Sequence, residues 1–404
     1  MDVMTGDFGS RLRSLRTARN LSQSALGGSR YTAGYISHLE SGRRQPTSEV
    51  VSYLAAELDV PREQLDPPED AQVGIAQVLD LELKLSQSWR DHDLRAVGAI
   101  AEELAELARS HDRVDVWWRA SLDRARALAL ADETEEASSL LASLREHELT
   151  RQSRSIAAEA LNLTSTVLFW SGQLSAAHHA ALEALAVTST MPVGASRRIR
   201  AMAALTHVLA TIGDTTEAVR TSHRLTDEAE HAGSLMVRGI AYWVAGEALL
   251  GAGDVTRGLD LLDQADQLVS PDVDAYTWGR FLRSTAMRLA LAGESERLVQ
   301  RLRLCASAPP ARAADTMAME HIAASIARSD GTSAGGAELA SWAGEECSGP
   351  SHLRGEALLA AVQMAPSSEL ALDWTREAEA LFRQAGAPWR ALVAVDAGRG
   401  LGSS

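Results

Sequence analysis

Apolar and polar residues alternate at helical spacing in several short segments near the start of the chain. In the first segment Phe8, Leu12 and Leu15 share one face, as the inner side of a helix requires. Ser22 can cap a second helix, since its hydroxyl can accept a hydrogen bond from a first-turn amide. The glycine pair at 27–28 is expected to end that helix.

A third helix is predicted after Thr32, with Ile36 and Leu39 pointing inward. Its outward face is formed by small and polar residues, namely Ala33, Gly34, Ser37, His38 and Ser41. Small side chains let a helix backbone approach the base edges in a major groove. A fourth helix over residues 48–58 would close this small core. The first sixty residues therefore predict a compact helical domain with one polar helix face.

From residue 71 onward the pattern is helical almost without interruption, and it repeats. Turn residues recur 40, 41, 40 and 40 positions apart, at Asp132, Gly172, Gly213, Gly253 and Gly293. A leucine stands four residues before each turn, and Ala, Ser, Thr or Gly stands seven before it. Five residues after it comes a small residue in the first four units and Leu298 in the last. Small residues at fixed positions favour close packing between paired helices.

Weaker copies of this unit occupy residues 71–110, 311–348 and 351–384, with turns near Asp91 and Gly331 in the first two. Residues 387–401 are expected to form a terminal capping helix. Pro61, Pro67 and Pro68 interrupt the pattern upstream. We therefore predict an all-α chain with a DNA-binding domain at 7–62, a linker at 63–70 and a repeat domain at 71–402.

The N-terminal part of the chain and the remainder differ in net charge. Residues 1–44 hold seven arginines and three acidic residues, a net charge of +4, whereas the whole chain is −15. A basic N-terminal part joined to an acidic remainder would confine contact with a polyanion to the N-terminal part. The two cysteines, Cys305 and Cys347, form no CxxC pair. The absence of a transmembrane-length apolar run or signal-peptide core predicts a cytoplasmic protein that does not contact membranes.

The first part resembles the Xre-type (lambda-repressor-like) helix-turn-helix family through LRSLR, LSQSAL, YISHLESGRRQPT and LAAEL, over roughly residues 8–60. The resemblance implies that Arg16 pairs with Glu40. The residues expected to contact a double-stranded DNA operator are Gln23, Thr32, Ala33, Gly34, Ser37 and His38, with Arg43 and Arg44 at backbone phosphates. A helical cap without any DNA role is the alternative.

The second part resembles tetratricopeptide repeats, although its period exceeds their ~34 residues. The resemblance implies a right-handed α-solenoid of about eight helical hairpins, whose first helices line a concave face. The positions expected to bind a ligand there are Arg119, Arg126, Asn162, Thr166, Trp170, Arg200, His207, Trp243, Glu247, Arg280 and Arg283. Mixed Arg, Asn and Trp side chains suit an extended peptide. The same tryptophans could instead be packing residues, and the arginines could be ion-paired within the repeats.

Enzyme chemistry has little support in the sequence. It contains no HExxH, GxSxG, Walker or SxxK motif, and Lys84 is the single lysine. The glycine-rich string at 251–258 follows a predicted helix and coincides with a repeat turn, so it is not expected to bind a nucleotide. The eleven histidines show no metal-ligand spacing. We expect no catalytic residue, no cofactor and no metal site.

An Xre-type head joined to tetratricopeptide-like repeats resembles the RRNPP-type peptide-responsive bacterial transcription regulators. That resemblance implies a quorum-sensing regulator whose repeat domain receives a signalling peptide or small-molecule effector and forms a homodimer. The alternative, from another functional class, is a repeat scaffold that binds a protein partner, with DNA binding that no small effector gates.

Overall fold

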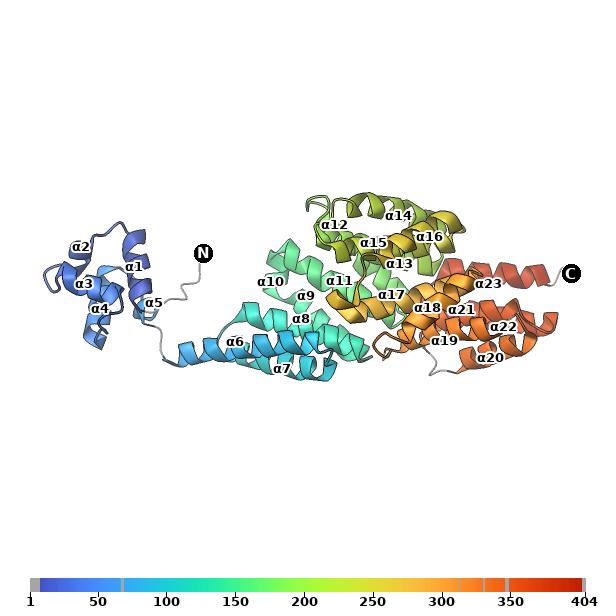
Figure 1. Ribbon diagram of the computed structural model, residues 1–404, viewed down its shortest axis with the longest axis horizontal. Coiled ribbons are helices and arrows are strands. Elements are labelled where there is room, and N and C mark those ends of the chain that lie inside the picture. The colour runs from blue at the N-terminus through green and yellow to red at the C-terminus, as the bar shows by residue number, and fades with distance from the viewer. Residues whose placement is uncertain (1–7, 67–68, 312, 330, 346–348, 402–404) are drawn as a thin grey trace. The chain divides into compact units, whose positions relative to one another are not determined.

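A computed structural model describes residues 8–66, 69–311, 313–329, 331–345 and 349–401. Within those ranges the regular structure is helical throughout, which confirms the all-α class (Figure 1). The chain divides into two compact units, Met1–Lys84 with Glu106–Val114, and Leu85–Ala105 with Asp115–Ser404. We call residues 8–66 of the first unit the head, and the second unit the body.

The head contains five helices. They are α1 (Phe8–Ala18), α2 (Gln23–Gly27), α3 (Ala33–Glu40), α4 (Ser48–Glu57) and α5 (Arg62–Leu65). The side-chain oxygens of Ser22, Thr32 and Thr47 accept hydrogen bonds from first-turn amides of α2, α3 and α4. Gly28, at a φ of +54°, ends α2. The starts of α2 and α3 and the end of α2 thus lie where the sequence signals predict them, and α4 begins at the predicted Ser48.

The head has its own apolar core, in which Leu12, Leu26, Ile36 and Leu39 are buried. Leu65 of α5 is also fully buried there, and its carbonyl accepts a hydrogen bond of 3.0 Å from Arg11 Nε. The predicted linker at 63–70 therefore needs correction. Its first residues complete the head because Leu65 packs into the core, and a new helix begins at Glu69.

The remaining helices pair into hairpins. In the described residues these are α6 (Glu69–Arg90) with α7 (Leu94–Ser110), α8 (Val114–Leu130) with α9 (Thr134–Glu146), α11 (Arg154–Trp170) with α12 (Leu174–Thr188), α13 (Ser196–Ile212) with α14 (Thr215–Ala229), α15 (Leu235–Gly251) with α16 (Val255–Asp266), α17 (Pro271–Leu291) with α18 (Ser295–Cys305), α19 (Ala314–Ser329) with α20 (Ser333–Gly344), and α21 (Ser351–Val362) with α22 (Ser368–Ala385). The helix α23 (Pro388–Leu401) follows them, where the terminal cap was expected. A short helix, α10 (Glu148–Gln152), lies between the second and third hairpins and was not predicted.

The repeat turns share one backbone geometry. The predicted turn residues Asp132, Gly172, Gly213, Gly253 and Gly293 all have φ between +73° and +91°. In every case the amide of the next residue donates a hydrogen bond of 2.9–3.0 Å to the carbonyl of the leucine four positions before the turn. This is the bond by which a left-handed residue closes a helix end. The 40-residue period is therefore confirmed as a recurring helix stop.

Small residues before and after the turns bring paired helices close together. A Cβ atom at Gly246 of α15 would lie 2.9 Å from the carbonyl oxygen of Gly258 in α16. In the third hairpin Ser165 Oγ donates a 3.0 Å hydrogen bond to the carbonyl of Ala177. Leu298, which departs from the small-residue pattern, is buried in the core of the body. The small residues around the turns therefore mark the places where the two helices of a middle hairpin approach closely.

Turns of early hairpins contact helices five hairpins later. Tyr276 Oη of α17 donates a 2.6 Å hydrogen bond to the carbonyl of His92, and the Ala314 amide at the start of α19 donates one of 3.0 Å to Asp132 Oδ1. A Cβ atom at Gly172 would lie 3.0 Å from Pro350 Cβ, just before α21. One at Gly213 would lie 2.9 Å from the Arg390 nitrogen of α23. Each early hairpin turn therefore packs against the element that follows it by about five hairpins.

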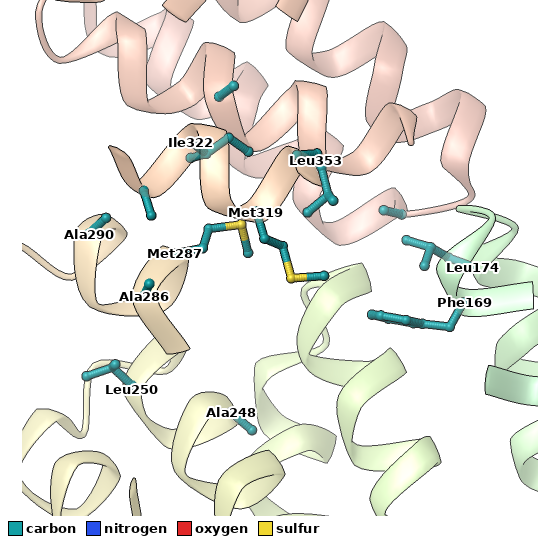
Figure 2. Packing of buried hydrophobic residues seen from close by; sticks show 14 of the residues in the cluster. Phe169, Leu174, Ala248, Leu250, Ala286, Met287, Ala290, Met319, Ile322 and Leu353 are labelled. Atoms are coloured by element: carbon teal, nitrogen blue, oxygen red, sulfur yellow. The ribbon is translucent and has the colours of Figure 1, made fainter. Parts of the chain in front are cut away.

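The later hairpins of the body also share one apolar interior. One apolar cluster runs from Phe169 in α11 to Ala394 in α23. Figure 2 shows Met287 and Met319 side by side, with Leu353 and Phe169 directed toward the same interior region from other helices. Because these residues come from hairpins distant in sequence, the interior depends on the long-range contacts as well as on neighbouring repeats.

Candidate DNA-binding and effector-binding surfaces

The outer face of α3 is accessible, as a base-reading surface must be. Thr32, Ala33, Gly34 and His38 are exposed and Ser37 is half-buried. The opposite face of α3 anchors the helix, since Ile36 and Leu39 are buried in the core of the head. Gly9 fixes α1 against the end of α3, because a Cβ atom there would overlap the Leu39 and Glu40 carbonyls.

Glu40 is the centre of a polar network beneath this face. Its carboxylate accepts hydrogen bonds from Arg16 Nε at 2.5 Å, Arg16 Nη2 at 3.1 Å and Gln23 Nε2 at 2.8 Å. Burial tends to raise the pKa of Glu40, but the bonds from Arg16 and Gln23 outweigh it and lower that pKa. The expected Arg16–Glu40 pair is present, and Gln23 is bonded to the same carboxylate.

Arg43 and Arg44 lie on the turn that follows α3, and both are exposed. Gly42, at a φ of +68°, makes this turn. The Arg44 guanidinium lies 4.9 Å from the centre of the Tyr35 ring, which orients it beside α3. Tyr35 was not singled out from the sequence, because its aromatic ring resembles an ordinary core residue until Arg44 is placed over it.

Arginines in the later part of the predicted ligand row are paired within the body. Arg280 donates hydrogen bonds to both carboxylate oxygens of Asp315, at 3.1 and 2.5 Å, and lies 3.9 Å from the Trp170 ring. Arg283 is 4% exposed and bonds Glu320 at 2.5 Å. Both acidic partners come from the next hairpin. This part of the row corresponds to the alternative in which the arginines hold repeats together.

Three further predicted residues lie inside the body. Trp243 and Glu247 of α15 are 8% and 2% exposed, and the Trp243 ring packs edge-on against Phe281. His207 of α13 is half-buried, with its ring 4.3 Å from that of Phe169. Burial lowers the pKa of His207 to about 3, so its imidazole is neutral at physiological pH.

The arginines in the earlier part of the predicted ligand row are exposed. Arg126 of α8 and Arg200 of α13 are exposed, and neither has an ion pair or hydrogen bond with a described residue. Arg119 is exposed as well. Desolvation, and then the positive charge of Arg126, lower the pKa of Arg200. A side chain that is open to solvent and still partly desolvated by protein is typical of a concave surface.

Three expected ligand positions lie on α11, between the helices that carry Arg126 and Arg200. Asn162 is buried, and its Nδ2 donates a 3.1 Å hydrogen bond to the carbonyl of Arg197 in the next hairpin, while its Oδ1 has no partner. Thr166 and Trp170 are half-buried. The amide of Asn162 is thus half engaged by protein, with one acceptor unused.

The inner face also carries polar residues that the sequence did not indicate. The charge of Arg288 of α17 lowers the pKa of both His207 and Glu247, and that of His352 of α21 lowers the pKa of His207. Glu356 of α21 raises the pKa of His352. The last hairpins depart from the repeat pattern, so their inner positions could not be assigned. In the described part of the chain no helix is long and apolar enough to cross a membrane.

Comparison with known proteins gives one sequence match and several solved structures of similar fold. No curated protein matches the chain. PlcR of Bacillus thuringiensis in complex with the peptide PapR7 and DNA is 16% identical, with 66% of this chain and 95% of that chain covered and a TM-score of 0.39. A Rap protein complexed with competence and sporulation factor is 11% identical, covers 98% of both chains and has a TM-score of 0.45. ComR from S. thermophilus in complex with DNA and its signalling peptide ComS is 12% identical over 80% of this chain and 100% of that chain, with a TM-score of 0.34.

Those identities and TM-scores are too low to transfer any residue's role. The sequence match concerns the head alone, because residues 7–67 fit the family described as "Helix-turn-helix domain". It agrees with the capped α2, the exposed face of α3 and the inclusion of α5 in the head. The chain therefore carries an N-terminal helix-turn-helix domain, a fold that proteins use to read duplex DNA, joined to helical hairpins.

Proposed function

We propose that this protein is a sequence-specific DNA-binding transcription regulator whose body binds an effector, a signalling peptide, that alters operator binding. The observation that carries the proposal is the presence, on one chain, of an accessible α3 face and of two exposed arginines, at expected ligand positions of the body, that form no ion pair with a described residue. The first suits a base-reading helix. The second leaves two cations available to a ligand.

The head supports the DNA-binding half of the proposal. Its α3 face has no large side chain to keep the backbone from the base edges, and Arg43 and Arg44 follow where phosphates would lie. The network of Arg16, Gln23 and Glu40 fixes α2 against α3. Gln23 retains its carbonyl oxygen for a base or phosphate-bound water while its amide holds Glu40.

The body supports the effector half. Arg126 of α8 and Arg200 of α13 form no ion pair with a described residue, in contrast to Arg280 and Arg283, and only the more distant charges of Glu159 and Asp274 oppose the lowering of the Arg200 pKa. The positive charge of Arg126 lowers the pKa of Arg200, so an anionic group beside these arginines would be stabilising. A peptide with an acidic side chain or a free carboxyl end would supply that group, and Asn162 Oδ1 could accept a bond from its backbone.

We also propose that the regulator is a cytoplasmic homodimer. Two heads would then read half-sites ~34–36 Å apart, one turn of DNA. The effector can change operator affinity only if it binds one arrangement of the heads more tightly than the other. The long-range contacts from His92 and Asp132 are structural elements that such a change could break or make.

Gel-shift titration of the full chain on its own upstream DNA, with and without peptide extract from the source culture, tests this function. We expect the extract to change operator affinity, and Arg126→Gln with Arg200→Gln to remove the change without altering affinity in its absence. The matched control is Arg224→Gln with Arg303→Gln, two exposed arginines on outer helices. An extract effect that survives in the first double variant would contradict the role of these arginines.

The alternative is a scaffold that holds a protein partner while DNA binding proceeds ungated. It is favoured by an apolar patch on α23, where Trp389, Leu392 and Val393 are 50%, 48% and 45% exposed. If no extract alters operator affinity and Trp389→Ala abolishes capture of a partner, the scaffold explains the protein better than the regulator.

A further inference from the structure

Three tyrosines of the head form one stack beside α3. The Tyr31 ring, in the turn before α3, lies on the Tyr35 ring of α3, with centres 5.1 Å apart and planes inclined by 21°. The Tyr53 ring of α4 meets Tyr31 edge-on at 5.2 Å. Tyr53 Oη donates a 3.1 Å hydrogen bond to the carbonyl of Gly27 at the end of α2. All three side chains are half-buried against the core of the head, so the stack joins α2, α3 and α4.

Arg44 contacts one end of this stack. Its guanidinium carbon lies 4.9 Å from the centre of the Tyr35 ring. Its backbone amide donates a 3.3 Å hydrogen bond to the carbonyl of His38, which holds the turn against α3. The side chain is exposed, and it forms no hydrogen bond or ion pair with a described residue. The ring therefore limits the direction of the guanidinium while its N–H donors stay available to a ligand.

Arg43 offers a contrast at the preceding position. It is also exposed, but its side chain forms no hydrogen bond, ion pair or ring contact within the described part of the head. Fixing an arginine side chain at a phosphate costs rotamer entropy. Arg44 has already lost part of that freedom against Tyr35, whereas Arg43 keeps it. Two neighbouring arginines of equal charge thus differ in how far they are preorganised for an anion.

The other end of the stack carries an arginine in a different state. The Arg30 guanidinium lies 5.5 Å from the centre of the Tyr53 ring, and its Nη2 also donates a 3.1 Å hydrogen bond to Glu49. A carboxylate therefore already compensates its charge. Of these two arginines, Arg44 is the one without an acidic partner among the residues described. A cation that is held by a ring and open to an anion is thus found at the α3 end.

We propose that Tyr35 is a positioning residue for DNA binding, which holds the Arg44 guanidinium for a phosphate of the duplex backbone. Tyr31 fixes the Tyr35 ring by stacking, and the ring orients the guanidinium, whose charge-assisted hydrogen bonds bind the phosphate. A phosphate contact carries no sequence information, so the effect should be equal on operator and other DNA. The inference rests on the proposed function, in that the head binds duplex DNA.

Fluorescence anisotropy of the full chain with a labelled duplex of random sequence tests this role. Tyr35→Leu should weaken binding about two- to fivefold, as the loss of an exposed cation–π contact implies. The slope of log affinity against log salt should stay nearly the same, because Arg44 keeps its charge, whereas Arg44→Ala should make it shallower by about 1. Tyr35→Phe keeps the ring and should bind as the wild type does.

A double-mutant cycle separates positioning from a structural effect on α3. In an Arg44→Ala chain, Tyr35→Leu should weaken binding no further, because no guanidinium remains for the ring to hold. In an Arg43→Ala chain, which has the same net charge, Tyr35→Leu should weaken binding as much as it does in the wild type. Equal losses in the two backgrounds would show that the ring acts through the fold of α3, and would overturn the proposal.

Lysine substitutions test the same role without changing the core of the head. Arg44→Lys keeps the charge but removes the planar guanidinium that stacks on an aromatic face, so it should cost about two- to fivefold more affinity than Arg43→Lys. Equal costs would overturn the proposal, and so would weaker binding by Tyr35→Phe, which would assign a DNA contact to the hydroxyl. A wild-type chain that binds no duplex would overturn the proposed function as well. Wild-type binding that Tyr35→Leu leaves unchanged would overturn the positioning role alone.

Discussion

Arg16 donates two hydrogen bonds to the Glu40 carboxylate, at 2.5 and 3.1 Å, and thereby joins α1 to the end of the helix that presents the polar face. The two side chains are 13% and 5% exposed, so this is a largely buried pair. Breaking such a pair leaves an uncompensated charge. The relationship ties the stability of the head to the position of α3.

Replacing Arg16 by Ala should therefore destabilise the head by about 3 kcal/mol and weaken DNA binding. Hydrogen exchange of α1 and α3 amides in the full chain measures the loss of local stability. The control is Arg30→Ala, which breaks an exposed pair with Glu49 and should cost about 0.5 kcal/mol or less. Equal losses in the two variants would show that the buried pair has no special role.

Arg43→Ala with Arg44→Ala should weaken binding to operator and non-operator DNA about equally. If both arginines contact phosphates, the slope of log affinity against log salt should become shallower by about 2. Anisotropy titrations at several salt concentrations measure that slope. Arg376→Ala with Arg383→Ala on α22 serves as the charge-matched control. A loss confined to the operator would instead assign base contacts to the pair.

Substitutions at two turn glycines with nearly the same φ distinguish the energetic cost of backbone strain from that of packing. Gly213 and Gly253 have φ of +88° and +91°, but a Cβ atom would meet Arg390 only at Gly213, and nothing lies within 4 Å at Gly253. Gly253→Ala should cost about 1 kcal/mol for the left-handed backbone, and Gly213→Ala about 2–4 kcal/mol because α23 must also shift. Urea unfolding of the two variants measures the difference. Similar values would mean that α23 does not press on the turn.

Acid should destabilise the body through its buried histidines. The pKa values of His207 and His352 are lowered from 6.5 to about 3 and about 4, so the native chain binds fewer protons than the unfolded chain between those limits. Stability is then highest above pH 6.5 and falls as the pH drops below it, by up to ~1.4 kcal/mol per pH unit for each histidine. Urea unfolding between pH 7 and pH 5 measures this slope.

His352→Leu should make the slope shallower by roughly half, since one of the two buried histidines no longer titrates. His179→Gln, a change at an exposed histidine of α12, is the control and should leave the slope unchanged. A slope that His352→Leu does not alter would assign the acid sensitivity to other groups.

The sequence reveals the hairpin turns because their cause is local. A residue such as Gly253 adopts a positive φ, the next amide bonds back to the leucine four positions earlier, and both requirements leave a mark at fixed spacing. Cap residues such as Thr32 are local in the same way. These features gave the element boundaries of the head and of the middle hairpins.

Ion pairs between residues of different hairpins leave no comparable pattern in the sequence. Arg200 and Arg280 occupy equivalent row positions, yet one is exposed without a partner and the other is bound by Asp315. Which of them finds an acid depends on the next hairpin, and Asp315 belongs to a hairpin whose repeat pattern is weak. The same holds for His352 and Arg288, which come from different hairpins and influence each other only through their charges.

The contacts between distant hairpins have a consequence for how the body comes apart. In an open row of repeats each unit touches only its neighbours, so the ends fray and the array melts in stages. Here hydrogen bonds such as that of Asp132 to the Ala314 amide fasten the second hairpin to the seventh. Loss of either end deprives the middle of its support, so the body should melt in one cooperative transition.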